Sequence, residues 1–255
     1  MIIEQDVTYF IFILARMSGC IMFSQIFGRG NVPIMFQIGL SIMLSIVVQG
    51  IIPPDNFPEI NLMIEYIVLI LKELFVGFII GHIMKLFFSV IAITGDFNDM
   101  QLGLSMAKIY DPKSNISMGI SATIFNIFFI LLFFSANGHM TLIKIFITSC
   151  KALPIGRLSF SSDLFMSLTE LFTNILIFSV KLSLPIFAIE FITEVGVGIL
   201  MKAVPQIHLF VVNIPLKILI GFTTMLILVP SFSTFLERLI TLMFEAIQKN
   251  LSLMV

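Results

Sequence analysis

Charged side chains that interrupt long apolar stretches are the residues of this sequence with the greatest capacity for chemistry. Glu190 and Glu194 are four residues apart in such a stretch, so on a helix both carboxylates lie on one face. Paired carboxylates inside a membrane can relay protons or bind cations. Glutamates at a helix end that faces water give the same spacing, and the spacing alone leaves both interpretations open.

Other charges stand within apolar surroundings nearer the N-terminus. Arg16 lies near the middle of the apolar stretch 7–27. A guanidinium stranded in lipid costs several kcal/mol, so we expect a carboxylate or several carbonyl groups beside it. Lys72, Glu73 and Lys85 interrupt a second apolar stretch. We expect Glu73 to form neutralising pairs with these lysines, which is a structural role rather than a catalytic one.

The residue types that usually mark an enzyme or a metal site are poorly placed. His82, His139 and His208 are widely spaced and have no H-E-x-x-H context, which argues against a metal site. The sequence has no glycine-rich phosphate loop and no nucleophile elbow. We therefore expect no enzymatic activity and no cofactor. The net charge of −1 gives no electrostatic footprint for nucleic acid.

The small and sulfur-containing residues suggest packing roles. Gly77 and Gly81 are four apart, a spacing that lets another backbone approach closely, although ordinary tight packing gives the same pattern. Cys20 and Cys150 both have apolar neighbours, and we expect them to be free buried thiols.

The elements that carry these residues are predicted to be membrane helices. Of the 255 residues 58% are hydrophobic and 11% charged, with a mean hydropathy of +1.11, whereas a soluble domain is about 25% charged. A membrane span needs about 20 apolar residues. We expect an all-α, polytopic membrane protein of about six to eight helices. Three uncharged stretches are clear spans: 30–54, 114–143 and 218–236.

Turn signals divide the chain further. Turns are predicted near Arg29 and at 53–56, 96–99, 111–115, 154–162 and 205, from proline, glycine and clustered polar residues. The stretch 62–94 holds four charges, whose cost in lipid roughly cancels the gain from its apolar residues. It is either two elements or one long helix that leaves the lipid. Such a segment needs protein around it, so we expect the chain to be unstable outside an assembly.

Several motifs follow one another along the chain. They are Leu14–Gly19 with Pro33, Glu73–Gly81, Gly103–Pro112, Asn137-Gly138-His139, Leu153-Pro154, Pro205-Gln206 with Phe210, and Pro215 with Lys217 and Gly221. Their order and spacing resemble the FliR/SctT family, the R subunits of type III protein export gates. FliR belongs to the flagellum and SctT to virulence injectisomes. The resemblance covers nearly the whole chain, and the flagellar branch fits better.

The resemblance implies a non-enzymatic conduit subunit of the flagellar basal body in the bacterial cytoplasmic membrane. Its implied partners are FliP-like and FliQ-like gate subunits, FlhB-like and FlhA-like export components, rod proteins and unfolded exported substrates. It also implies a FliP-like region over 1–175 and a FliQ-like hairpin over 176–255. A loop at 106–119 would plug the closed pore, and its key residues are Met106, Lys108, Tyr110, Asp111, Pro112, Lys113, Ser114 and Asn115.

Two alternatives remain at this level. One is an injectisome gate subunit of the same family. The other is a secondary transporter of a small solute, which would use Glu190, Glu194 or Lys181 at a helix broken near Pro185.

Overall fold

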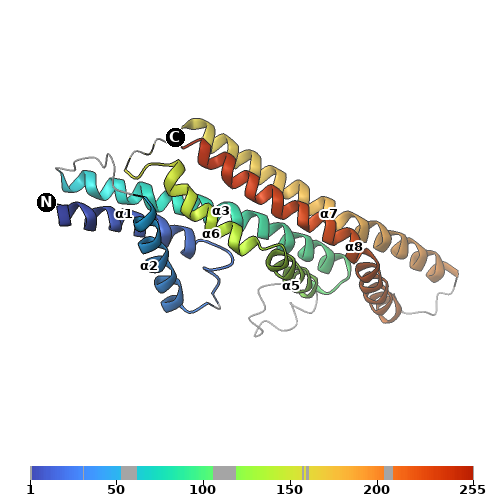
Figure 1. The fold of residues 1–255 in the computed structure, drawn as a ribbon. Helices are drawn as coiled ribbons and strands as arrows, with labels where there is room; N and C mark the ends of the chain where they lie inside the picture. The colour runs from blue at the N-terminus through green and yellow to red at the C-terminus, as the bar shows by residue number, and fades with distance from the viewer. Residues whose placement is uncertain are drawn as a thin grey trace. The chain divides into compact units, whose positions relative to one another are not determined.

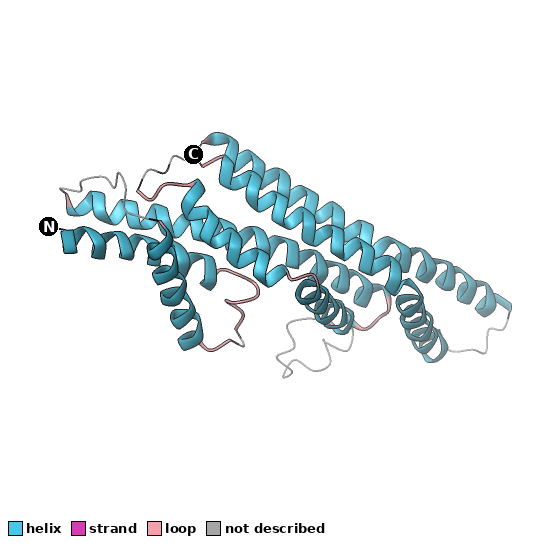
Figure 2. Ribbon diagram, in the orientation of Figure 1, coloured by secondary structure: helices cyan, strands magenta, loops and turns pink. Residues whose placement is uncertain are grey.

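A computed structural model describes residues 2–30, 32–52, 62–105, 119–156, 158, 161–203 and 209–254. This part of the chain consists of helices joined by turns and loops, without a strand (Figures 1 and 2). Its helices are α1 (Ile2–Met22), α2 (Ile34–Ile51), α3 (Met63–Gln101), α5 (Ile120–Ser135), α6 (Gly138–Ala152), α7 (Ser162–Ala203) and α8 (Leu209–Ser252). Seven helices in the described residues agree with the expected six to eight.

Helix α2 illustrates how local sequence sets the boundaries. Pro33 is its N-cap residue, with φ −56° and ψ 136°, and proline's fixed φ suits a helix start. No charged residue occurs along the helix. The polypeptide between α1 and α2 folds into turns, in which the backbone amides of Ile26 and Phe27 donate to Ser24 Oγ. The turn predicted near Arg29 is confirmed.

Helix α3 settles the ambiguity over stretch 62–94. It is one helix of 39 residues, about 58 Å long at 1.5 Å per residue, which exceeds the hydrocarbon core of about 30 Å. The predicted turn at 96–99 is wrong, because α3 continues through it to Gln101. Asp99 is buried there, and its Oδ1 accepts the Ser121 backbone amide at 3.1 Å. A tertiary contact thus satisfies a polar residue that resembled a turn former.

The chain divides into two compact units. Unit 1 comprises Met1–Phe87, Asn137–Phe172 and Thr241–Val255, and unit 2 comprises Phe88–Ala136 and Thr173–Ile240. In unit 1, α1 contacts α2 and α6. Its core includes Phe12, Met17, Ile83 and Phe146, all fully buried. This division groups residues by contact, and a fusion boundary near residue 175, which falls inside α7, stays a prediction.

Unit 2 packs α3, α5, α7 and α8 through aromatic side chains and one close backbone approach. Phe88 meets Phe129 edge to face with ring centroids 4.8 Å apart, and Phe125 meets Phe232 at 5.3 Å. A Cβ on Gly95 would lie 2.1 Å from the Ala122 Cα, so α3 and α5 touch backbone to backbone at this point.

The long uncharged stretch 114–143 is not one helix, contrary to expectation. Helix α5 ends at Ser135 and α6 begins at Gly138. Asn137 between them is left-handed, with φ 55° and ψ 29°, a conformation that asparagine tolerates better than most residues. The Asn-Gly pair therefore breaks the helix in apolar surroundings.

Four helices are long and apolar enough to cross a membrane, judged within the described ranges. They are Ile34–Ile51, Met63–Gln101, Ser162–Ala203 and the Val212–Ser252 part of α8. Helices α5 and α6 add a fifth span if the broken pair counts as one. The chain is an all-α polytopic membrane protein.

Candidate functional site

A buried ion pair joins α1 to α3 in unit 1. The Arg16 Nε and Nη2 atoms each lie 2.6 Å from Glu73 Oε2. Both side chains have no exposed surface. The Arg16 Nη1 also donates to the carbonyl oxygens of Ser149 and Leu153, each at 2.9 Å. The carboxylate and carbonyl partners expected for Arg16 are both present.

The carbonyl partners belong to the C-terminal end of α6. The last carbonyls of a helix lack intrahelical partners, and the helix dipole places partial negative charge there. Ser149 is in the last turn of α6 and Leu153 is its C-cap. Arg16 therefore neutralises Glu73 and caps α6 with one guanidinium.

Glu73 is held by a second contact. Its Oε1 accepts the Gly156 backbone amide at 2.8 Å, and Gly156 has a φ of 81° that favours glycine. The pairs expected between Glu73 and Lys72 or Lys85 are wrong. The carboxylate turns toward the core, whereas Lys72 Nζ donates to the Leu158 carbonyl at 3.4 Å and Lys85 is exposed. This cluster exposes no reactive group and serves to hold helices together.

Glycines let α1 and α3 approach closely enough to form the pair. A Cβ on Gly77 would lie 2.4 Å from the Arg16 carbonyl oxygen and 2.6 Å from the Cys20 nitrogen. A Cβ on Gly81 would lie 2.6 Å from the Phe23 carbonyl carbon, and one on Gly19 would lie 2.6 Å from the Leu74 oxygen. The spacing of Gly77 and Gly81 thus lets the backbone of α1 and of the adjoining Phe23, in the same chain, pack closely against α3.

A second charge cluster joins α7 to α8 in unit 2. Lys217 Nζ lies 3.2 Å from Glu194 Oε2, with the Glu194 side chain 54% exposed. Glu190, one turn earlier, is fully buried. A Cβ on Gly221 would lie 3.0 Å from Glu190 Oε1. Neither carboxylate oxygen of Glu190 accepts a hydrogen bond from the described residues.

The two glutamates therefore share a helix face without sharing an environment. Glu190 lies in the middle of α7, not at a helix end. Helix α7 runs unbroken past Pro185, so the broken helix that a transporter mechanism needs is not found there. Lys181 lies on the same continuous helix. No group of three or more metal-binding side chains occurs among the residues described.

The structure describes only some of the remaining predicted residues. Asn137 is the left-handed N-cap of α6, Gly138 is its buried first residue, and His139 is half-buried. Pro215 is inside α8. Phe210 belongs to α8, but its side chain is not described. Residues 106–118, Pro205 and Gln206 lie outside the described residues, and with them Met106, Lys108, Tyr110, Asp111, Pro112, Lys113, Ser114 and Asn115.

Sequence reasoning missed several functional contacts. Gly19, the carbonyls of Ser149 and Leu153 and the amide of Gly156 all belong to the Arg16 cluster. The end of α6 before Pro154 was a usable signal, because helix ends expose carbonyls that attract cations. Both cysteines are free and buried, as expected.

Sequence comparison identifies relatives over most of the chain. The profile of a family described as "Bacterial export proteins, family 1" matches residues 7–243. The flagellar biosynthetic protein FliR of Escherichia coli K12 is 27% identical, covering 94% of this chain and 91% of that protein. FliR of Bacillus subtilis 168 is 26% identical over 96% and 95% of the two chains. FliR of Borreliella burgdorferi is 27% identical over 94% and 90%.

Proposed function

The chain belongs to the bacterial export proteins, family 1, and from that premise we propose that it is a structural and gating subunit of the flagellar type III protein export gate. The observation that carries this proposal is the match over residues 7–243 together with relatives from distant bacteria that are all named FliR. The subunit forms part of a pore for unfolded flagellar proteins in the cytoplasmic membrane and has no reaction of its own.

The buried charges support an architectural role. The Arg16–Glu73 pair lies inside unit 1 with backbone groups on both partners, where it fixes helices and meets no substrate. Charged residues inside an apolar protein usually mark pathways for ions or solutes. In unit 1 the buried Arg16–Glu73 pair instead holds helices of the same chain together. This role favours a conduit subunit over a solute carrier.

The exposed apolar surface supports assembly with other helical subunits. Large apolar residues are exposed along α2 and α7, among them Met35 at 80% and Ile192 at 70%. Such surfaces face lipid or partner helices. We propose FliP-like and FliQ-like subunits as these partners, with FlhB-like and FlhA-like components and rod proteins beyond them. The FliP-like region would end near residue 175.

The residues around Asp111-Pro112 are proposed to seal the resting pore. A pore wide enough for an unfolded chain leaks ions unless something fills it. A seal must be held by contacts weak enough for export to displace it. The family resemblance supports the stretch 106–119 in this role, and the Asp-Pro pair supports a loop there.

Deletion of the gene from its bacterium tests the proposed function directly. Flagellar filament protein should disappear from the culture medium and return when the intact chain is supplied in trans. Unchanged secretion in the deletion strain would reject the proposal.

The seal has a separate test. Replacing residues 108–117 by a short Gly-Ser linker should leave assembly intact and allow ions to cross membranes that hold the assembled complex. Planar-bilayer conductance measures this leak. A shortened complex that assembles and stays as tight as the parent would move the seal to another subunit.

A further inference from the structure

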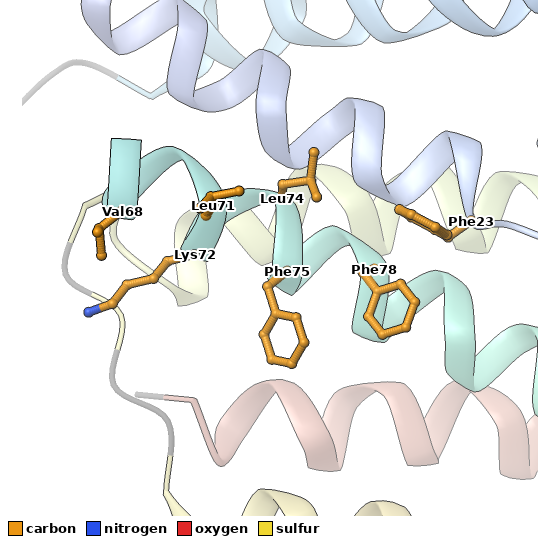
Figure 3. Close-up of a pocket in the computed structure, with 7 residues that line it drawn as sticks. All are labelled: Phe23, Val68, Leu71, Lys72, Leu74, Phe75 and Phe78. Atoms are coloured by element: carbon orange, nitrogen blue, oxygen red, sulfur yellow. The ribbon is translucent and has the colours of Figure 1, made fainter. Parts of the chain in front are cut away.

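An apolar groove in unit 1 ends at Lys72, which forms no ion pair with the residues that the structure describes. The groove has a volume of about 440 Å³ and runs along α3, with Phe23 from the end of α1 closing one side (Figure 3). Its apolar walls include Val68, Leu71 and Phe75, and Lys72 is the one charged residue among the described residues that line it. Val68, Leu71 and Phe23 are exposed by 45%, 57% and 42%, so the groove opens to the surroundings of unit 1.

The polarity of this groove is ordered along its length. From Val68 to Phe78 is ten residues, or about 15 Å along a helix. Figure 3 shows the rings of Phe75 and Phe78 on one side of α3, while the Lys72 ammonium extends past Val68, away from both rings. Side chains on a helix lean toward its N-terminus, and a lysine in a membrane extends its ammonium toward the polar boundary. One end of the groove is thus cationic and the rest apolar.

Lys72 lacks an anionic partner in the described part of unit 1. Its one hydrogen bond is the 3.4 Å contact to the Leu158 carbonyl, a long one. The neighbouring carboxylate, Glu73, is buried on Arg16 and Gly156. None of the ion pairs between described residues uses Lys72. Within the described part of unit 1 the ammonium therefore has no countercharge.

We propose that this groove binds an anionic phospholipid, with one acyl chain along Phe75 and Phe78 and the headgroup phosphate on Lys72. A phospholipid carries its anion at the end of an apolar chain, which is the order of polarity in the groove. Basic residues beside membrane helices attract anionic headgroups. Helix α3 is long and apolar enough to cross a membrane, and the groove that it lines is exposed on unit 1 at Val68 and Leu71. The inference is independent of the seal and of the branch of the family.

Photolabelling of the full-length chain tests the proposal. The chain is purified from membranes with the subunits that accompany it and placed in phosphatidylethanolamine vesicles. These contain either phosphatidylglycerol or phosphatidylcholine, with the same diazirine-bearing acyl chain. Peptide mass spectrometry then locates the label. Phosphatidylglycerol should label residues 68–78 about fivefold more than phosphatidylcholine, the preference expected from one lysine near a headgroup.

Two lysines of the same helix provide matched variants. Lys72→Gln should reduce phosphatidylglycerol labelling to the phosphatidylcholine level, and Lys72→Arg should keep the preference. Lys85→Gln should leave it unchanged, because Lys85 is exposed and does not line the groove. The preference in the parent protein is itself a test if Lys72→Gln fails to assemble.

Three results would overturn the proposal. Equal labelling by the two lipids would remove the role of the headgroup. A preference that survives Lys72→Gln would remove the role of Lys72. An absence of label from residues 68–78 would mean that something other than lipid, such as a partner helix, covers the groove.

Discussion

Arg16 in unit 1 and Glu190 in unit 2 are equally buried, yet their surroundings differ. Arg16 meets Glu73 and two carbonyl oxygens of its own chain. Glu190 has no hydrogen-bond donor among the described residues, and the nearby Lys217 pairs with Glu194 instead. Burying a charge is costly at both positions. Contacts among the described residues offset this cost at Arg16 but not at Glu190.

This difference indicates that the two units use charge in different ways. Unit 1 satisfies its buried ion pair with groups of its own chain. In unit 2, no hydrogen bond from the described residues offsets the burial of Glu190. We therefore expect substitutions of the Arg16 cluster to damage the chain itself, and substitutions of the Glu190 cluster to have small effects on its stability.

The largest effect is expected at Arg16. Arg16→Glu places two carboxylates where a pair exists, whereas the leucine of Arg16→Leu can pack against the apolar core. Breaking a buried pair costs about 3–5 kcal/mol, and reversal adds repulsion. The yield of assembled complex, measured by affinity purification and gel filtration, should fall to near zero for Arg16→Glu. The decrease should be smaller for Arg16→Leu. Equal yields would remove the case for a specific partner.

A packing change at Gly77 should cost less than a charge change in the Arg16 cluster. The Cβ of Gly77→Ala would lie 2.4 Å from the Arg16 carbonyl oxygen, and overpacking of this kind costs about 1–3 kcal/mol. Gly196→Ala in α7 is the matched control, because nothing lies within 4 Å of its Cβ. Thermal unfolding of the purified complex should show a lower midpoint for the first variant only. A shared decrease would contradict the packing explanation, because alanine by itself favours a helix more than glycine does.

The same substitution, glutamate to glutamine, can be made at Glu73 in unit 1 and at Glu190 in unit 2. Glu73→Gln leaves the Arg16 guanidinium without its countercharge and should destabilise the complex by about 3 kcal/mol or more. Glu190→Gln removes a charge that accepts no hydrogen bond from the described residues. The unfolding free energy of this variant should stay within about 1 kcal/mol of the parent. Chemical denaturation of each purified complex measures both changes in unfolding free energy. A greater loss at Glu190 would show that its charge is required.

The smallest effect is expected at Glu194. The Glu194 side chain is 54% exposed, whereas that of Lys217 is 11% exposed. Solvent around Glu194 screens the pair, and exposed pairs contribute about 0.2–1 kcal/mol. Glu194→Gln should therefore lower stability by less than about 1 kcal/mol, and the difference from the parent should shrink in high salt. Thermal midpoints at low and high salt measure this. A salt-independent loss would contradict a simple surface pair.

The composition and the positions of proline and other turn-forming residues predicted much of the fold. The hydrophobic content indicated a polytopic helical protein, and Pro33 marked the start of α2. The need of Arg16 for partners followed from the cost of a buried charge. Which carboxylate it meets did not follow, because Glu73 is 57 residues away and only packing of α1 on α3 brings them together.

The errors came from local signals that tertiary contacts override. Asp96 to Asp99 resembled a turn, but Asp99 pairs with the amide of Ser121 across to α5, so the helix continues. The opposite error arose at Asn137, where composition suggested one uncharged span. Its left-handed conformation ends that span despite apolar neighbours. A buried tertiary contact decides the case of Asp99, and the left-handed backbone of the exposed Asn137 decides the other.

Co-purification followed by native mass measurement tests the central claim most directly. The chain is expressed alone and together with the FliP-like and FliQ-like proteins of the same bacterium. The account predicts degradation or aggregation of the chain alone, and with its partners a single complex whose mass includes this chain and several copies of theirs. A monodisperse, thermally robust monomer that ignores those partners would contradict the assignment of this protein as an export-gate subunit.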